Sequence, residues 1–218
     1  MKFLVLITAR ADSRRLKNKN LLKLNKKSLL YWSISHAKKI KENKKIVVST
    51  DSKKILNVAN KCGVNTKWLR PKKLAKSISS SESVIKHAFL LEKKNGFAAD
   101  AIIILQPTTP FRFKKDINKC IKLFKSNPKR PVISVTKIKH PTKLLYPIRN
   151  KLKILKTSKS LFMPNGSIYI INSKQIFKTN NYLKLDPNFI EFKGIKNNID
   201  VDTFEELALS RLLFSKNI

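Results

Sequence analysis

The stretch AIIILQPTTP at residues 101–110 joins the most apolar run of the sequence directly to a polar segment held by two prolines. Ala101–Leu105 is predicted to be a strand covered on both faces, because strands inside parallel sheets are nearly continuous apolar runs. Gln106–Pro110 then forms a rigid rim, since proline fixes its own backbone angle. Ligands of open parallel sheets bind at the carboxyl ends of the strands. The sequence therefore predicts a site where this strand ends.

Short apolar runs alternate with segments of helical period on both sides of this strand, a pattern typical of βαβ units. Further strands are predicted at residues 2–8, 45–50, 64–69, 132–136 and 167–171. Helices are predicted at residues 29–40 and 52–62, through Val84–Leu91, through Ile117–Phe124 and from Thr203 onward. We therefore expect an α/β fold: a Rossmann-like, mostly parallel sheet with helices on both faces.

The 218 residues suffice for one principal domain. Periodicity fails between Lys137 and Met163, where Lys, Pro and Thr dominate, and this interval is too long for a simple loop. We therefore divide the chain into a main domain, residues 1–136 and 164–218, and an arm, residues 137–163.

The charge balance is strongly basic: 48 Lys and Arg oppose 13 Asp and Glu, which gives a formal net charge of +35. A basic nucleic-acid module is one hypothesis that this balance supports. However, 40 of the basic residues are lysines spread along the whole chain and only 8 are arginines. Arginine is the better residue for bidentate contacts with phosphates and bases. We therefore expect no specific nucleic-acid partner.

The chain carries no apolar stretch of the roughly 20 residues that a membrane helix needs. The run Phe3–Ala9 is predicted to be a buried strand rather than the core of a signal peptide. The two cysteines, Cys62 and Cys120, lack the CxxC spacing of a zinc site and are expected to be free thiols. These features predict a cytoplasmic protein with no membrane partner.

Charged residues follow several of the predicted strands, and they include Arg10 to Lys19, Asp51, Arg70, and Asp200 with Asp202. Cations and a carboxylate pair at one edge of a sheet suit a nucleoside triphosphate and its metal ion. Neither a Walker GxxxxGK[ST] loop nor GxGxxG is present. Plainer interpretations stay open: a solvated basic loop at Arg10 to Lys19, a cap of the final helix by Asp200 and Asp202, and a cap of helix 52–62 by Asp51.

Seven runs in order carry a family resemblance: Ile7–Arg10 with Ser13, Lys19–Leu21, Val48–Asp51, Leu69–Pro71 with Leu74–Ala75, Leu105–Arg112, Pro164–Ile170 and Ile199–Thr203. With these runs the chain, from residue 4 to about residue 210, resembles the acylneuraminate cytidylyltransferases, which include the CMP-sialic acid synthetases and relatives acting on legionaminic or pseudaminic acid. The resemblance implies a fold of the nucleotide-diphospho-sugar transferase type. It also implies transfer of CMP from CTP to the anomeric hydroxyl of a nonulosonic acid, a nine-carbon 2-keto acid sugar, with release of pyrophosphate. The alternatives are another keto sugar such as Kdo, or the nucleic-acid module.

The resemblance also implies roles for individual residues, with the catalytic roles on Arg10, Lys19, Asp200 and Asp202. Arg10 and Lys19 would hold the triphosphate, and Asp200 and Asp202 would hold Mg²⁺. The residues implied for the cytidine are Ser13, Asn20, Arg70 and Ser81, and those on the sugar side are Gln106 and Asn165. Tyr182 could stack on the sugar, although packing is the default for an aromatic residue.

The chain departs from the family pattern at several positions. Ala11 and Asp12 replace the usual glycines of the first loop, and Met163 replaces an arginine ahead of Pro-Asn-Gly. Lys143 or Lys159 could supply the missing cation on the sugar side. The family also implies a homodimer in which the arm reaches a partner, and the arm's apolar Leu144, Leu145, Tyr146, Leu161 and Phe162 agree with this.

Overall fold

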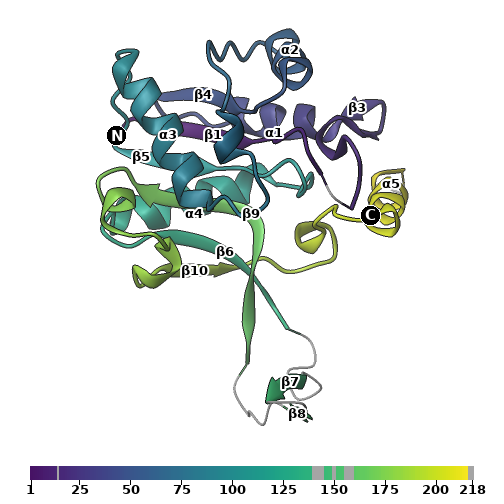
Figure 1. Cartoon of the computed structure of the whole chain (residues 1–218). Coiled ribbons are helices and arrows are strands. Elements are labelled where there is room, and N and C mark those ends of the chain that lie inside the picture. Colours follow the sequence, from purple (N-terminus) through teal and green to yellow (C-terminus); the bar gives the residue numbers. More distant parts are fainter. Residues whose placement is uncertain (14, 139–144, 149–150, 155–159, 216–218) are drawn as a thin grey trace.

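A computed structural model describes residues 1–13, 15–138, 145–148, 151–154 and 160–215 of the chain (Figure 1). The strands of the main sheet are β1 (Phe3–Thr8), β4 (Lys44–Ser49), β5 (Ala101–Ile104), β6 (Val132–Lys137), β9 (Phe162–Asn172) and β10 (Asn188–Glu191). The α-helices are α1 (Leu29–Lys38), α2 (Lys53–Lys61), α3 (Ser81–Lys94), α4 (Lys114–Ser126) and α5 (Phe204–Ser215). Two small antiparallel pairs join β2 (Lys23–Leu24) to β3 (Lys27–Ser28) and β7 (Leu145–Ile148) to β8 (Lys151–Ile154).

The main sheet has the strand order β10-β6-β9-β5-β1-β4. β1 pairs in parallel with both β4 and β5, and β10 pairs in parallel with β6. Only β9, of the strands described in this sheet, runs antiparallel to its neighbours β5 and β6. The predicted α/β fold with a mostly parallel sheet is confirmed.

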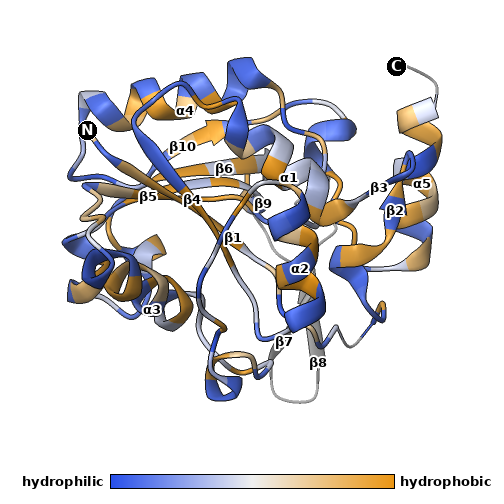
Figure 2. Ribbon diagram, turned by 90° about the horizontal axis from the view of Figure 1, so that it is seen from above, coloured by the Kyte–Doolittle hydropathy of each residue, from blue (hydrophilic) through white to orange (hydrophobic). Residues whose placement is uncertain are grey.

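Alternation along β1 shows why this strand is apolar throughout. Phe3, Val5 and Ile7 pack into one cluster, together with the inner faces of α1, α2 and α4. Leu4 and Leu6 point the other way and pack against α3. Successive side chains of a strand point to opposite faces, so a strand between two helical layers needs apolar residues at every position. Figure 2 shows α3 and α4 on opposite sides of the sheet.

Two sequence predictions about strands were inaccurate. Residues 64–69 were predicted as a strand but form no ladder. Val64 and Thr66 are both buried, but the segment is bonded to β4 through a side chain and not through a backbone ladder: the Val48 N–H donates to Thr66 Oγ1 at 2.9 Å. The short edge strand β10 was missed, because four residues with the pattern NFIE carry little periodic signal.

A third apolar cluster fixes α5 and the segment before it. Ile199 and Val201 pack with Leu207 and Leu213 of α5 and with residues around the β2–β3 hairpin. The rings of Trp32 and Phe214 lie 4.8 Å apart within this cluster. The cluster holds the segment that carries Asp200 and Asp202 beside the main sheet.

The predicted arm begins where β6 and β9 extend past the rest of the sheet, and β7 and β8 lie at its far end (Figure 1). Lys143, Leu144 and Lys159 lie outside the described residues. The division into a main domain and an arm stays a prediction.

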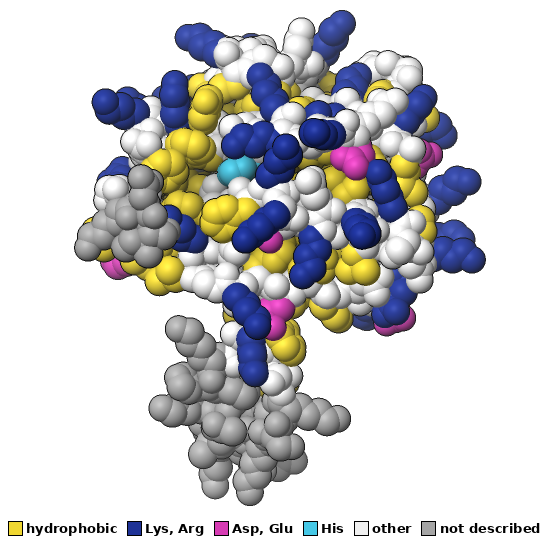
Figure 3. All heavy atoms as spheres, turned by 180° about the vertical axis from the view of Figure 1, so that it is seen from behind, with side chains coloured by type: hydrophobic (Ala, Val, Ile, Leu, Met, Phe, Trp, Pro, Cys, Tyr) yellow, Lys and Arg dark blue, Asp and Glu magenta, His cyan; other side chains and the backbone are white. Residues whose placement is uncertain are grey.

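The distribution of basic residues and the state of the two cysteines match what the sequence led us to expect. Lys and Arg side chains are scattered over the face shown in Figure 3, with apolar side chains between them. Cys62 is half-buried and Cys120 buried, and both are free thiols. Among the residues that the structure describes, no helix combines the length and apolar character needed to cross a membrane.

We predict that His36 makes stability depend on pH. This α1 residue is buried, and its Nε2–H donates to the Pro110 carbonyl at 2.9 Å. Burial, aided by the nearby Arg112 cation, lowers its pKa from 6.5 to about 4. The unfolded chain therefore takes up this proton first as the pH falls. The free energy of unfolding should be unaffected by His36 above pH 7 and should fall by up to about 3 kcal/mol between pH 6.5 and 4.

Denaturant unfolding of wild type and His36→Gln at several pH values tests this prediction. The variant keeps an N–H donor but does not titrate. The stability difference between the two proteins should shrink as the pH falls from 7 to 4.5, whereas a constant difference would contradict the prediction.

Candidate active site

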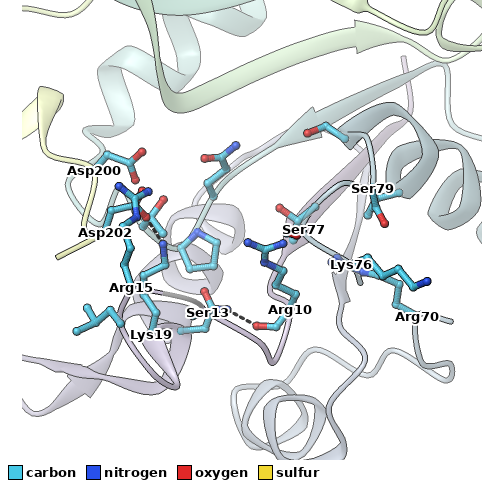
Figure 4. A pocket seen from close by; sticks show the side chains of 18 of the residues that line it. Arg10, Ser13, Arg15, Lys19, Arg70, Lys76, Ser77, Ser79, Asp200 and Asp202 are labelled. Atoms are coloured by element: carbon cyan, nitrogen blue, oxygen red, sulfur yellow. Dashed lines mark hydrogen bonds and ion pairs between the residues drawn. The ribbon is translucent and has the colours of Figure 1, made fainter. Parts of the chain in front are cut away.

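A pocket of about 620 Å³ opens at the carboxyl ends of β1, β4 and β5. Nine of the residues proposed from the sequence line it: Arg10, Ser13, Lys19, Asn20, Arg70, Ser81, Gln106, Asp200 and Asp202. Asp200 and Asp202 lie at one side of the pocket with Lys19, Arg10 projects into its middle, and Ser77, Ser79 and Arg70 lie opposite (Figure 4). Residues far apart in sequence thus meet at the sheet edge where the sequence placed the site.

The loop after β1 is held in shape by side chains that bond to its backbone. Asp51 Oδ1 accepts a hydrogen bond from the Ala11 N–H at 2.8 Å, and Asn20 Nδ2 donates to the Arg10 carbonyl at 2.9 Å. The hypothesis that Asp51 caps the second helix is wrong, because Ser52 Oγ accepts from the Ile55 N–H. These fixed contacts also argue against a merely solvated basic loop.

The opposite wall is anchored by Arg70. Its Nε and Nη2 donate to the Ser49 hydroxyl and carbonyl at 3.0 and 2.5 Å. Burial lowers the pKa of Arg70 to about 10, with Asp51 acting in the other direction, so the guanidinium is still charged at neutral pH. Lys76 and the serines at positions 77, 79 and 81 complete this wall.

Asp200 and Asp202 flank Val201, a buried residue whose N–H donates to the Thr108 carbonyl at 2.7 Å. With Val201 turned inward, the two carboxylates line the same pocket. Desolvation raises the pKa of Asp200; a hydrogen bond from Thr108 opposes the shift, and the negative charge of Asp202 adds to it. Asp202 forms ion pairs with Lys19 and Arg15.

The alternative role of this pair, as the cap of the final helix, is wrong. Thr203 Oγ1 accepts from the Glu206 N–H at 3.3 Å, and Glu206 Oε2 accepts from the N–H of Thr203 at 2.8 Å. This reciprocal arrangement is a capping box. It leaves both aspartates facing the pocket.

The two aspartates suit a magnesium ion that a phosphate helps to bind. The described part of the chain has no cluster of three or more His, Cys, Asp or Glu residues that could hold a metal alone. Mg²⁺ in nucleotide sites is usually bound by one or two carboxylates, phosphate oxygens and water. Asp200 and Asp202 fit this donor set.

The loop after β5 depends on Arg112, to which sequence reasoning gave no role. This buried side chain donates to the Ser167 carbonyl at 2.7 Å, to Thr109 Oγ1 at 2.6 Å and to the Gln106 carbonyl. Burial lowers the pKa of Arg112 to about 9, and Asp200 counteracts this shift. The sequence feature that could have indicated this role is an arginine, a rare residue in this chain, directly after Pro110 and Phe111.

Gly166 lets Gln106 lie against the backbone of β9. Gly166 has a φ of +72°, and a Cβ built there would lie 2.8 Å from Gln106 Oε1. A larger residue would therefore both strain the backbone and displace the Gln106 amide.

Two of the proposed substrate contacts, Asn165 and Tyr182, are not part of the pocket lining that the structure describes. Asn165 is buried, and its Oδ1 accepts from Ser134 Oγ at 2.6 Å. Tyr182 packs its ring 5.9 Å from that of Tyr169, which matches the packing interpretation. Lys143 lies outside the described residues. Conversely, sequence reasoning did not assign Arg15, Lys76, Ser77, Ser79 and Thr108 to the site, although all line the pocket.

Comparisons with known proteins agree with this geometry. The sequence matches the cytidylyltransferase family over residues 4–212. It is 32% identical to the CMP-N,N'-diacetyllegionaminic acid synthase of Legionella pneumophila, in an alignment covering 100% of this chain and 98% of that protein. It is 31% identical to the N-acylneuraminate cytidylyltransferase of Escherichia coli, covering 83% of this chain but only 45% of that protein.

A solved structure shares the fold. It is a CMP:2-keto-3-deoxy-manno-octonic acid synthetase complexed with CTP, with a TM-score of 0.73 over 100% of both chains. The sequence identity is 16%, so this likeness bears on the fold alone.

Proposed function

The chain belongs to the cytidylyltransferase family, and we propose that it transfers CMP from CTP to the anomeric hydroxyl of a nonulosonic acid, with release of pyrophosphate. The observation that supports this most is the pocket itself, where Lys19 lies beside the carboxylates of Asp200 and Asp202 and Arg10 projects into the same cavity. A nucleoside triphosphate with its metal ion needs both kinds of group within one cavity.

In the proposed reaction the acceptor hydroxyl oxygen bonds to the α-phosphorus, and the bond from that phosphorus to the pyrophosphate oxygen breaks. The hydroxyl proton is lost to water. Arg10 and Lys19 stabilise the negative charge of the triphosphate, which is the main contribution a protein makes to phosphoryl transfer. Magnesium, held by Asp200 and Asp202 when bound, would supply further charge neutralisation on the departing pyrophosphate.

We assign the wall opposite the aspartates to the cytidine. Arg70, Ser81 and Asn20 all line the pocket. Asn20 and Arg70 are also buried and fixed by hydrogen bonds. Rigid polar groups favour the recognition of one base, because an incorrect base would leave them unpaired.

The acceptor is assigned to the side of the pocket formed by Gln106. The two relatives act, by their names, on different nonulosonic acids, so identity near 30% supports the sugar class and not one sugar. Kdo is the alternative acceptor. Met163, which replaces the family arginine, is 51% exposed and offers no charge for a sugar carboxylate.

Purified protein incubated with CTP, Mg²⁺ and a panel of sialic, legionaminic, pseudaminic and Kdo acceptors tests the proposal. We expect a CMP-sugar and one pyrophosphate per turnover with at least one nonulosonic acid. CTP binding without product from any of the four would contradict the proposed transfer, and product from Kdo alone would favour the alternative.

Asp200→Asn and Asp202→Asn should each lower turnover about 10²-fold or more, a loss of roughly 2.7 kcal/mol of transition-state stabilisation. Each substitution removes a charge from the metal site but keeps the side-chain volume. Asp12→Asn is the matched control, because Asp12 is an exposed carboxylate of the first loop outside the pocket lining. Turnover within a few-fold of wild type for both pocket variants at saturating Mg²⁺ would remove the pair from the mechanism.

Gly166→Ala should impair use of the acceptor selectively. The new Cβ displaces the Gln106 amide, so kcat/KM for the sugar should fall roughly 10- to 100-fold while KM for CTP changes little. Gly194→Ala is the control, since Gly194 also has a positive φ (+88°) but open space around it. Similar kinetics in the two variants would show that backbone strain, and not Gln106, is responsible.

We also propose that the protein is a homodimer assembled through the arm. At its base β9 pairs Met163 with Thr136 and Phe162 with Lys137, and the apolar Phe162 and Met163 are each about half exposed. Exposed apolar residues on a projecting element favour an interface. Light scattering should give about twice the 25.1 kDa of one chain, and a single-chain mass at micromolar concentration would contradict the dimer.

A further inference from the structure

Two cations share one carboxylate at the mouth of the pocket. Lys19 Nζ contacts Asp202 Oδ1, and Arg15 Nη2 contacts Asp202 Oδ2 (Figure 4). Both oxygens of Asp202 are therefore engaged by cations. Asp200 adds a second carboxylate nearby, but the described lining of the pocket as a whole has more cationic side chains than carboxylates and therefore attracts a further anion.

The two cations differ in how firmly they are held. The Lys19 side chain is 16% exposed, whereas that of Arg15 is 68% exposed. Lys19 also begins the short 3-10 helix Lys19–Leu21, which α1 packs against. Ion pairs of exposed side chains contribute little to stability. Arg15 can therefore leave Asp202 at small cost, while its backbone stays at the pocket.

Resting on the proposed function, we propose that Arg15 binds the β- and γ-phosphates of CTP and exchanges its pairing with Asp202 for them. As the side chains stand, Arg15 competes with a divalent cation for Asp202. Asp202 would hold a divalent ion that arrives with the triphosphate, and the released Arg15 guanidinium would then bind the phosphate oxygens. The planar guanidinium suits this role, because its paired N–H donors match phosphate oxygens bidentately.

The lining of the pocket supports a phosphate as the new partner of Arg15. Among its described residues, Asp200 and Asp202 are the only carboxylates, against five cationic side chains: Arg10, Arg15, Lys19, Arg70 and Lys76. A guanidinium released from Asp202 therefore finds no other acidic side chain there, since Asp200 is implied in the same metal site. Phosphate oxygens are the remaining strong acceptors.

The exchange predicts opposite effects of removing Arg15 on two binding reactions. Arg15→Gln should bind Mn²⁺ alone about threefold or more tightly than wild type, because one competitor for Asp202 is gone. The same variant should bind CTP with Mg²⁺, and pyrophosphate with Mg²⁺, about 10-fold more weakly, the size of effect expected for one charge-assisted contact. A residue with a purely structural role would not move these affinities in opposite directions.

Calorimetric titration of wild type, Arg15→Gln, Arg15→Lys and Lys17→Gln with these three probes tests the proposal. Lys17 is an exposed residue of the same loop outside the pocket lining, so Lys17→Gln removes the same net charge and should leave all three affinities within twofold of wild type. Arg15→Lys keeps the charge but not the bidentate geometry and should give intermediate values.

Two outcomes would overturn the proposal: unchanged Mg²⁺–CTP affinity in Arg15→Gln, or weakening of Mn²⁺ and Mg²⁺–CTP binding together. If wild type and Arg15→Gln bind CTP equally well, the role of Arg15 is contradicted and the proposed function stands. A wild-type protein that binds neither CTP nor pyrophosphate would contradict the proposed function itself.

Discussion

The buried guanidinium of Arg112 joins the loop after β5, which lines the pocket, to α1 and β9. Its N–H groups donate to Ser33 of α1, to the loop after β5 and to Ser167 of β9. A charge removed from water is tolerated only when hydrogen bonds replace its hydration, so these segments must converge on it. The converged loop places the Thr108 carbonyl, which holds Val201 and thereby aims the two aspartates at the pocket. The position of the proposed metal site thus depends on an arginine that does not itself line the pocket.

The site has a rigid side, where side chains are buried, and an exposed side, where ion pairs can exchange partners. Arg70, in the wall that we propose for the cytidine, and Arg112, behind the loop after β5, are both buried, and any displacement would leave their N–H groups unpaired. The mouth is built from ion pairs that water already screens, such as that of Arg15. Fixed hydrogen-bond donors favour selective binding of one base. Contacts that exchange at low free-energy cost favour the entry of a triphosphate and the release of pyrophosphate.

Sequence patterns correctly predicted those strands whose burial determines every residue along them. Burial on both faces makes β1 and β5 continuously apolar, and both were predicted to within a residue. Residues 64–69 show the limit: the alternation of Val64 and Thr66 reports which side chains turn inward, but not whether the backbone forms a ladder. The roles of Arg112 and Asn165 are set by partners distant in sequence, Ser167 for the first and Ser134 for the second, so no local pattern reveals them. The pocket residues that were identified came from ordered motifs at strand ends, where topology brings them together.

The first loop, which we propose to bind the triphosphate, is shaped without glycine. Glycine usually serves in such turns because it adopts positive φ and admits a close backbone approach. Here Ala11 has its N–H fixed by Asp51, and the left-handed position falls on Asn18, with a φ of 55°, a residue type that tolerates this conformation. The two contacts span the loop from β4 and from Asn20, so side chains supply the shape that glycine would otherwise permit. Such contacts lower the conformational entropy that this loop would lose on binding a triphosphate, because they already hold Arg10 and Ala11 in place in the folded chain.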